Sequence, residues 1–250
     1  MKDAAPRPNA VCYFATCLVD LFYPEAGLSG IRLIQREGIR VVFPRGQSCC
    51  GQPAFNSGYA DEAREVARAQ LRLFPGDEPV VVLSGSCAGM IRRHYPDLFA
   101  GDRDEGAARA FASRVVELTS FLVNVLGVRL ADRGEPVRVA WHASCHALRE
   151  CGVDREPLEL LAQLRGVTVA PVARERECCG FGGTFAVRHA EIAGAMADDK
   201  AAAVEETGAQ LLLSGDGGCL MNVGGRLAAR GSRIAPRHIA EFLWERTRDR

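Results

Sequence analysis

The sequence predicts an α/β protein made of two duplicated small parallel β-α units, with cysteine sites at the carboxyl ends of the strands. Three observations lead to this fold class. Short apolar runs alternate with longer amphipathic runs along the 250 residues. The same order of runs occurs twice. In both halves, the cysteines that recur at matching spacings follow an expected strand.

The first half is expected to hold three strands and two helices. The helical run 28–37 is stopped by Gly38, and Pro44 ends the short apolar strand that follows. Pro79 opens a third run that is wholly apolar, which is typical of a buried parallel strand. The expected strands are 11–16, 39–43 and 80–83, and the expected helices are 28–37 and 61–74.

The second half repeats this order and adds two closing helices. Gly166 and Gly208 stop its two main helical runs, as Gly38 does in the first half. The expected strands are 137–141, 167–171 and 210–213, and the expected helices are 157–165, 190–207, 220–230 and 238–248.

These elements suggest a division of the chain into three parts. Residues 8–97 form the first cysteine-rich repeat, and residues 136–250 form the second repeat with its closing helices. Residues 98–135 are expected to link them and to contain one amphipathic helix over 107–126.

Composition excludes several classes of function. The formal net charge is zero and basic residues are interspersed with acidic ones, so we expect no nucleic-acid partner. No apolar run approaches the roughly 18–20 residues of a membrane helix, so no integral membrane segment is expected. Residues 1–8 lack the features of a secretory signal, which favours a cytoplasmic protein. In that reducing compartment, ten cysteines indicate metal or redox chemistry rather than disulfides.

Each half carries one cysteine, then a vicinal pair followed by glycine, then a further cysteine. The first gap is 31 residues in one half and 32 in the other, and the second gap is 36 and 39. Because parallel strands end at one edge of a sheet, each set is expected to converge. The expected metal ligands are Cys17, Cys49, Cys50, Cys87, Cys145, Cys178, Cys179 and Cys219.

Four cysteines per repeat suit either a [4Fe–4S] cluster or a structural zinc ion. A vicinal pair cannot easily place both sulfurs at tetrahedral angles on one zinc, whereas two irons of one cluster could share them. One iron–sulfur cluster per repeat is therefore favoured, with zinc in one repeat as the alternative. Nearby glycines would let backbone N–H groups approach a negative cluster. These expected cofactor-binding glycines are Gly180, Gly182, Gly183 and Gly218.

Two histidines flank the first cysteine of the second repeat. His142 and His146 are the candidate catalytic residues, since an imidazole can ligate iron, hydrogen-bond a cluster sulfide or shuttle a proton. The alternative is that local backbone groups satisfy them. Two cysteines fall outside the repeated pattern: Cys12 is expected to be a packed core thiol, and Cys151 a spectator.

The motifs around these residues resemble the CCG cysteine-rich domain proteins, and most nearly the lactate utilisation protein A family. Related members are the iron–sulfur subunits of heterodisulfide reductase and glycolate oxidase. The resemblance covers essentially the whole chain. Its motifs are residues 16–20, 49–58, 84–87, 144–146, 178–185 and 218–222. One departure is that the closing CxxC of the broader family keeps only its first cysteine, because Met90 and Asn222 occupy the second position. Four ligands per site then fit a cubane cluster better than a five-cysteine cluster.

The resemblance implies an iron–sulfur redox subunit of a three-protein system that oxidises L-lactate to pyruvate, acting in a complex rather than alone. Its implied partners are a ferredoxin-like iron–sulfur subunit and a third small subunit, with a small 2-hydroxy acid as a candidate substrate. Two other functions remain open on the residues alone. One is a zinc-stapled scaffold without redox activity, and the other is a disulfide-handling thiol or cluster reductase of the heterodisulfide reductase type.

Overall fold

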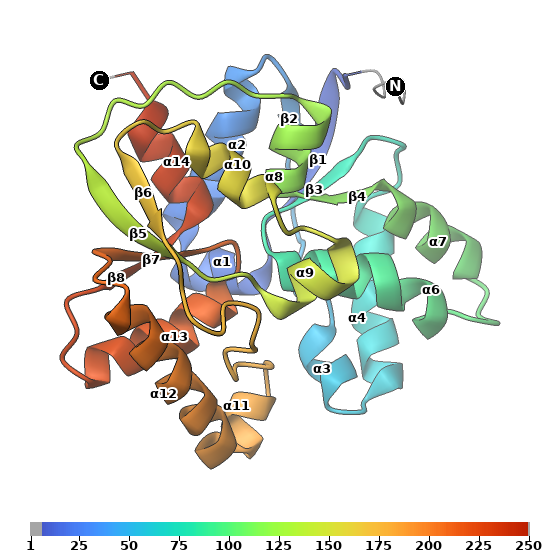
Figure 1. The fold of residues 1–250 in the computed structure, drawn as a ribbon. Helices are drawn as coiled ribbons and strands as arrows, with labels where there is room; N and C mark the ends of the chain where they lie inside the picture. The colour runs from blue at the N-terminus through green and yellow to red at the C-terminus, as the bar shows by residue number, and fades with distance from the viewer. Residues whose placement is uncertain (1–6, 250) are drawn as a thin grey trace.

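The computed structural model describes residues 7–249 and contains two parallel sheets of four strands each (Figure 1). The expected α/β class and the duplicated β-α units are confirmed. We expected no secretory signal in residues 1–8. Residues 1–6 of that segment lie outside the part of the chain that the structure describes. Within 7–249, no helix combines the length and the apolar character needed to cross a membrane.

Both sheets have the same strand order. The central strands of the first sheet are short and wholly buried, which suits their continuous apolar sequences. The first sheet has the order β2-β1-β3-β4, formed by β1 (Ala10–Phe14), β2 (Arg40–Val42), β3 (Val80–Val82) and β4 (Val115–Glu117). The second has the order β6-β5-β7-β8, formed by β5 (Val137–Trp141), β6 (Val167–Ala170), β7 (Leu211–Ser214) and β8 (Ala235–His238).

The helices of the first half cover its sheet and form the links between strands. Two of the segments are single π-helical turns, η1 and η2, each continuing a short α-helix. The segments are α1 (Cys17–Phe22), α2 (Pro24–Arg36), α3 (Gln52–Asn56), α4 (Ala60–Leu73), α5 (Gly85–Gly89), η1 (Met90–His94), α6 (Tyr95–Leu98), α7 (Glu105–Arg114), α8 (Leu118–Ser120) and η2 (Phe121–Val125).

The helices of the second half occupy matching positions relative to their strands. A short helix again starts at a cysteine after the first strand of the repeat, and a long helix again follows the vicinal pair. The segments are α9 (Cys145–Cys151), α10 (Glu156–Ala162), α11 (Phe185–Arg188), α12 (Ala190–Glu206), α13 (Gly217–Ala229) and α14 (Ile239–Thr247).

The expected helix over 107–126 is wrong, because β4 interrupts it. Val115 and Val116 are β-branched residues that pair in parallel with β3 and complete the first sheet. The boundaries at 97 and 135 stay predictions, although β4 ties part of the segment 98–135 to the first sheet. The edge strand β8 was also not expected. It contains Pro236, which an edge strand tolerates because one side of its backbone is unpaired.

The two halves share one apolar core. It combines side chains such as Leu33 and Leu83 from the first half with Trp141, Leu161 and Leu213 from the second. The closing helix α14 of the second half packs on α2 of the first (Figure 1). In return, α8 and η2 from the first half pack on α10 of the second. This reciprocal packing buries one face of both sheets together.

A second reciprocal contact joins the helices that carry the cysteines. Helix α5 packs on α9, and a Cβ atom added at Gly85 would lie only 2.4 Å from Ala147 Cβ. Helix α13 contacts α1, with Gly217 close to Leu18 and Tyr23. The carboxyl-end loops of one sheet are therefore held against those of the other.

We expect Gly85→Ala to destabilise the protein by ~1–3 kcal/mol, because its methyl group would overpack the α5–α9 contact. The matched control is Gly194→Ala in α12, where no atom lies within 4 Å of the added Cβ. That substitution should stabilise by roughly 0.5–1 kcal/mol, since alanine restricts the unfolded chain. Urea unfolding of both variants measures the difference, and equal midpoints would contradict the close contact.

Candidate metal centres

The eight recurring cysteines lie in two sets, each at the carboxyl ends of the strands of one sheet. In each set, one cysteine starts a helix after the first strand, the pair lies on the loop after the second, and the last cysteine lies in the helix after the third. We call them the first centre (Cys17, Cys49, Cys50 and Cys87) and the second centre (Cys145, Cys178, Cys179 and Cys219).

In the first centre, Cys50 Sγ lies 3.2 Å from Cys87 Sγ, and both side chains are buried. Cys17 and Cys49 are half-buried and hydrogen-bond to each other. The centre opens into a cavity of about 260 Å³. Thr16, directly before Cys17, has a φ of 73°, a left-handed conformation that a β-branched residue rarely adopts. Strain of this kind often accompanies a functional site.

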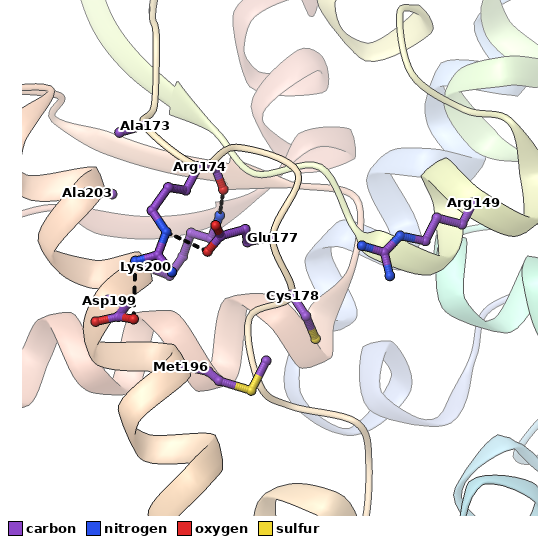
Figure 2. Close-up of a pocket in the computed structure, with 9 residues that line it drawn as sticks. All are labelled: Arg149, Ala173, Arg174, Glu177, Cys178, Met196, Asp199, Lys200 and Ala203. Carbon is purple, nitrogen blue, oxygen red and sulfur yellow. Dashed lines mark hydrogen bonds and ion pairs between the residues drawn. The ribbon is translucent and has the colours of Figure 1, made fainter.

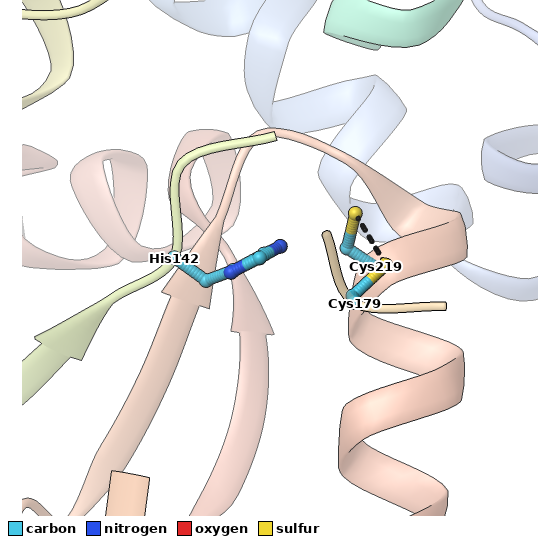
Figure 3. Close-up of side chains that lie close together, drawn as sticks. All are labelled: His142, Cys179 and Cys219. Atoms are coloured by element: carbon cyan, nitrogen blue, oxygen red, sulfur yellow. Dashed lines mark hydrogen bonds between the residues drawn. The ribbon is translucent and has the colours of Figure 1, made fainter. Parts of the chain in front are cut away.

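The second centre repeats this arrangement. Cys179 Sγ lies 3.2 Å from Cys219 Sγ, and Cys145 Sγ lies 4.0 Å from Cys178 Sγ. Cys179 and Cys219 are again the buried members. His142 adds a nitrogen donor: its ring nitrogen and the sulfurs of Cys179 and Cys219 all lie within 4.8 Å of one another (Figure 3).

One cysteine in each centre has a pKa far below that of an ordinary thiol. A hydrogen bond from Cys17 is the main cause that lowers the pKa of Cys49 to about 3. A hydrogen bond from Cys145 does the same in the second centre, where the pKa of Cys178 falls to about 2. The pKa values of the donors Cys17 and Cys145 are raised correspondingly. Each centre thus offers a stabilised thiolate, the form that binds metals.

The glycine after each vicinal pair is required by the turn. Gly51 and Gly180 have φ values of 87° and 83°, in the left-handed region. A Cβ at Gly180 would lie 2.7 Å from Ala193 O in α12, so only glycine lets the loop press against that helix. The N–H of Gly180 donates to Cys178 Sγ at 3.4 Å, and that of Gly51 donates to Cys49 Sγ at 3.4 Å. Backbone donors therefore do reach the sulfurs.

The other three expected cofactor-binding glycines have packing reasons of their own. Gly182 and Gly183 both have positive φ values, and Gly183 packs at ordinary distance against Pro53 of the first half. A Cβ at Gly218 would lie 2.5 Å from the ring of Phe181, so Gly218 makes room for that ring. A role of these glycines in holding a cofactor stays a prediction.

The two centres are neighbours across the interface between the halves. Phe181 and Gly183 from the second half line the cavity of the first centre. Gln52 and Ser86 from the first half line the small pocket at the second centre. All four residues line both spaces, so about one layer of side chains separates the two centres.

Asp216 is a buried carboxylate that the sequence analysis missed. Its Oδ2 accepts a hydrogen bond from Ser86 N at 2.9 Å and another from Ser144 Oγ at 3.1 Å, and its Oδ1 accepts one from Gly218 N at 3.3 Å. It therefore connects the first turn of α5, which carries Cys87, to the N-cap of α9, which begins at Cys145. The available signal was a lone acidic residue within the glycine-rich run 214–219.

The two candidate histidines lie at different parts of the second centre. His142 is buried beside Cys179 and Cys219. His146 is half-buried, with its Nδ1 3.5 Å from Cys145 Sγ and its Nε2 3.8 Å from Glu150 Oε1. The two histidines therefore contact different cysteines and cannot have the same role in the second centre.

The remaining residues singled out in the sequence pack around the centres or hold the nearby backbone in place. Cys12 is buried in the core of the first half, and Cys151 Sγ lies 3.9 Å from Gly85 O in the α5–α9 contact. Met90 is fully buried in the same core as Cys12. Asn222, at the position of the missing closing cysteine, donates to Cys179 O at 2.7 Å and so fixes the backbone of the pair.

A pocket of about 280 Å³ lies beside Cys178 (Figure 2). Its floor is charged but internally paired: Arg174 forms ion pairs with Glu177 and Asp199, and Lys200 donates to backbone carbonyls. Arg149 of α9 extends toward Cys178 from the opposite side (Figure 2). The second centre therefore has a polar approach beside Cys178.

This fold and this cysteine pattern define a duplicated cysteine-rich domain. The family model described as "CCG: Cysteine-rich domain" matches residues 11–92 and 139–224. "Lactate utilization protein A" of Geobacillus sp. (strain WCH70) is 45% identical over 93% of this chain and 98% of its own length. The protein of that description from Bacillus subtilis (strain 168) is 44% identical over the same shares. The chain belongs to the lactate utilization protein A family.

A solved structure supports the fold alone. A hypothetical protein from Helicobacter pylori superposes with a TM-score of 0.68 at 9% sequence identity. The match covers 98% of this chain and 50% of that chain.

We expect Asp216→Ala to lower the free energy of unfolding by about 1–3 kcal/mol, because the buried Ser144 hydroxyl and the Ser86 N–H both lose their acceptor. The matched control is Asp198→Ala, which removes the exposed ion pair with Arg226 and should cost less than about 1 kcal/mol. Urea unfolding of the metal-free chains measures both values. Equal losses would show that Asp216 does not bind the two halves together.

Proposed function

We propose that this chain is the iron–sulfur subunit of a system that oxidises L-lactate to pyruvate. In this proposal it relays electrons through two [4Fe–4S] clusters, one held by each centre. The observation that carries the proposal is the pair of neighbouring four-cysteine sets. The lactate assignment draws on the name of the relatives, "Lactate utilization protein A".

The direction of the sulfurs supports a cluster over a single metal ion. In each vicinal pair the two sulfurs face different partners: Cys178 faces Cys145, whereas Cys179 faces Cys219. The first centre does the same with Cys49 and Cys50. A pair that points two ways suits ligation of two irons of one cluster better than chelation of one zinc ion.

The surroundings of the cysteines also suit a buried cluster. Iron–sulfur clusters supply single-electron transfer, which none of the side chains alone provides. The chain contributes thiolates, the backbone donors at Gly51 and Gly180, and a barrier to water from Phe181. Hydrogen bonds to sulfur and burial are the means by which a protein tunes the potential of such a cluster.

We further propose that the chain works in the cytoplasm with a ferredoxin-like iron–sulfur subunit and a third small subunit. Exposed apolar side chains next to the first centre support docking of a partner there. Leu21 and Phe43 are 70% and 44% exposed beside Cys17, and Val187 is 82% exposed at the cavity of the first centre. A small 2-hydroxy acid is the proposed substrate class of the assembled system.

Anaerobic purification should give a brown protein that contains iron and acid-labile sulfide. We expect Cys179→Ser to remove the iron of the second centre, because it deletes a buried ligand. The matched control Cys151→Ser should retain the iron of both centres, since Cys151 contacts a backbone carbonyl outside them. Iron and sulfide analysis with electron paramagnetic resonance measures both. A colourless protein with stoichiometric zinc, or equal iron loss in the two variants, would rule out this assignment.

The lactate assignment has its own test. Addition of L-lactate should reduce the clusters only when the chain is mixed with its partner subunits. The absorbance change of the chain alone, of the partners alone and of the mixture would be followed anaerobically. Clusters that stay oxidised in the complete mixture would refute the lactate role while leaving cluster binding intact.

A further inference from the structure

The second centre contains a buried histidine that the first centre lacks. Tyr13 and Trp141 occupy equivalent positions in the two central strands, four residues before the first cysteine of each repeat, and both lie in the shared core. The next residue is Phe14 in the first half, where it is buried in the core of that half, and His142 in the second. The His142 side chain is only 2% exposed.

Neither Nδ1 nor Nε2 of His142 makes a hydrogen bond of standard geometry within residues 7–249, and the ring has a looser contact with the sulfur of Cys219 in the second centre. Leaving a buried polar group unsatisfied costs about 1–3 kcal/mol, and folded proteins rarely tolerate it. An imidazole has two such groups. The arrangement therefore indicates a partner that is not a protein side chain or backbone group.

The ring is directed at the sulfurs of the second centre (Figure 3). Its ligand nitrogen and the sulfurs of Cys179 and Cys219 lie within 4.8 Å of one another. A nitrogen and a sulfur that bind one metal at ~2.0–2.1 Å and ~2.3 Å lie at most about 4.4 Å apart, and two such sulfurs lie at most about 4.6 Å apart, so small rotations bring this triad onto one ion.

We propose that His142 is a metal ligand of the second centre, bound through a ring nitrogen beside Cys179 and Cys219. The identity of the metal as iron rests on the proposed function. The second centre then has five donors, one of them nitrogen, whereas the first has four sulfurs. His146 is not this ligand, because it lies at Cys145 and faces Glu150.

The nitrogen ligand has an electronic consequence. An imidazole is neutral, so as a fifth donor it adds no negative charge to the four thiolates of the second centre, whereas a thiolate at the same position would add one. Substitution of His142 by cysteine should therefore lower the reduction potential of the second centre, because the added thiolate raises its negative charge.

The decisive measurement uses the wild-type chain, purified anaerobically with natural-abundance or ¹⁵N-labelled histidine and then reduced. Pulsed electron paramagnetic resonance should show the hyperfine coupling of a directly bound nitrogen, and ¹⁵N labelling should change it. Iron-edge X-ray absorption should include a nitrogen scatterer at about 2.0–2.1 Å. Because no substitution is involved, this test does not depend on any variant folding.

Variants locate the nitrogen. In His142→Ala the coupling should vanish, whereas the matched control His146→Ala should keep it. In His142→Cys a redox titration should show a lower midpoint potential for the second centre, while that of the first centre stays unchanged. Coupling that survives in His142→Ala and vanishes in His146→Ala would overturn the proposal.

The outcomes separate this inference from the proposed function. A brown protein whose iron shows only sulfur ligands and no nitrogen coupling overturns the role of His142 and leaves the cluster assignment standing. An iron-free protein overturns the cluster assignment. In that case the zinc-edge spectrum decides the ligand: a nitrogen scatterer that disappears in His142→Ala supports His142, and an all-sulfur zinc overturns it.

Discussion

The close contact between α5 and α9 constrains the rest of the molecule. Each repeat places its cysteines at the carboxyl edge of its own sheet, so the separation of the two centres depends on how the sheets are joined. Gly85 lets Ala147 approach α5 closely, Gly217 lets α13 meet α1, and Asp216 accepts hydrogen bonds from the first turn of α5 and the N-cap of α9. The shared core behind these contacts prevents the halves from separating. Neither repeat completes its own surroundings, because Phe181 of the second half lines the first centre.

Much of this arrangement was predictable from local sequence. Continuous apolar runs identify buried parallel strands, and the strand order of each repeat then places its cysteines at one edge. The strands β4 and β8 were not predictable in this way. Val115–Glu117 directly continues a helical run, and Ala235–His238 is a polar edge strand containing proline. Both segments become strands because they pair with a neighbouring strand, and the local sequence pattern contains no signal for that pairing.

The candidate centres were predictable to the extent that their residues recur. The spacing of the cysteines gave both sets, because a repeated spacing reflects a repeated fold. Asp216 escaped notice because its hydrogen bond to Ser86 spans 130 residues and has no counterpart in the first half. His142 was a candidate by proximity in sequence, but its burial and its lack of hydrogen bonds of standard geometry emerge only from the packing around β5. Residues such as Asp216 and His142 occur in only one of the two repeats, so a comparison of spacings between the repeats cannot identify them.

These departures from symmetry matter for a relay. Two identical centres would have equal potentials, and nothing would favour passage of an electron in one direction. The duplication keeps the strand order and the geometry of the Cys–Cys–Gly turn, which hold the sulfurs. It varies the positions around them: Phe14 corresponds to His142, and Glu117 corresponds to His238 as the buried residue that caps the next helix. Because ligand type, burial and nearby charge all shift a reduction potential, the conserved frame can hold two centres of different potential at short range.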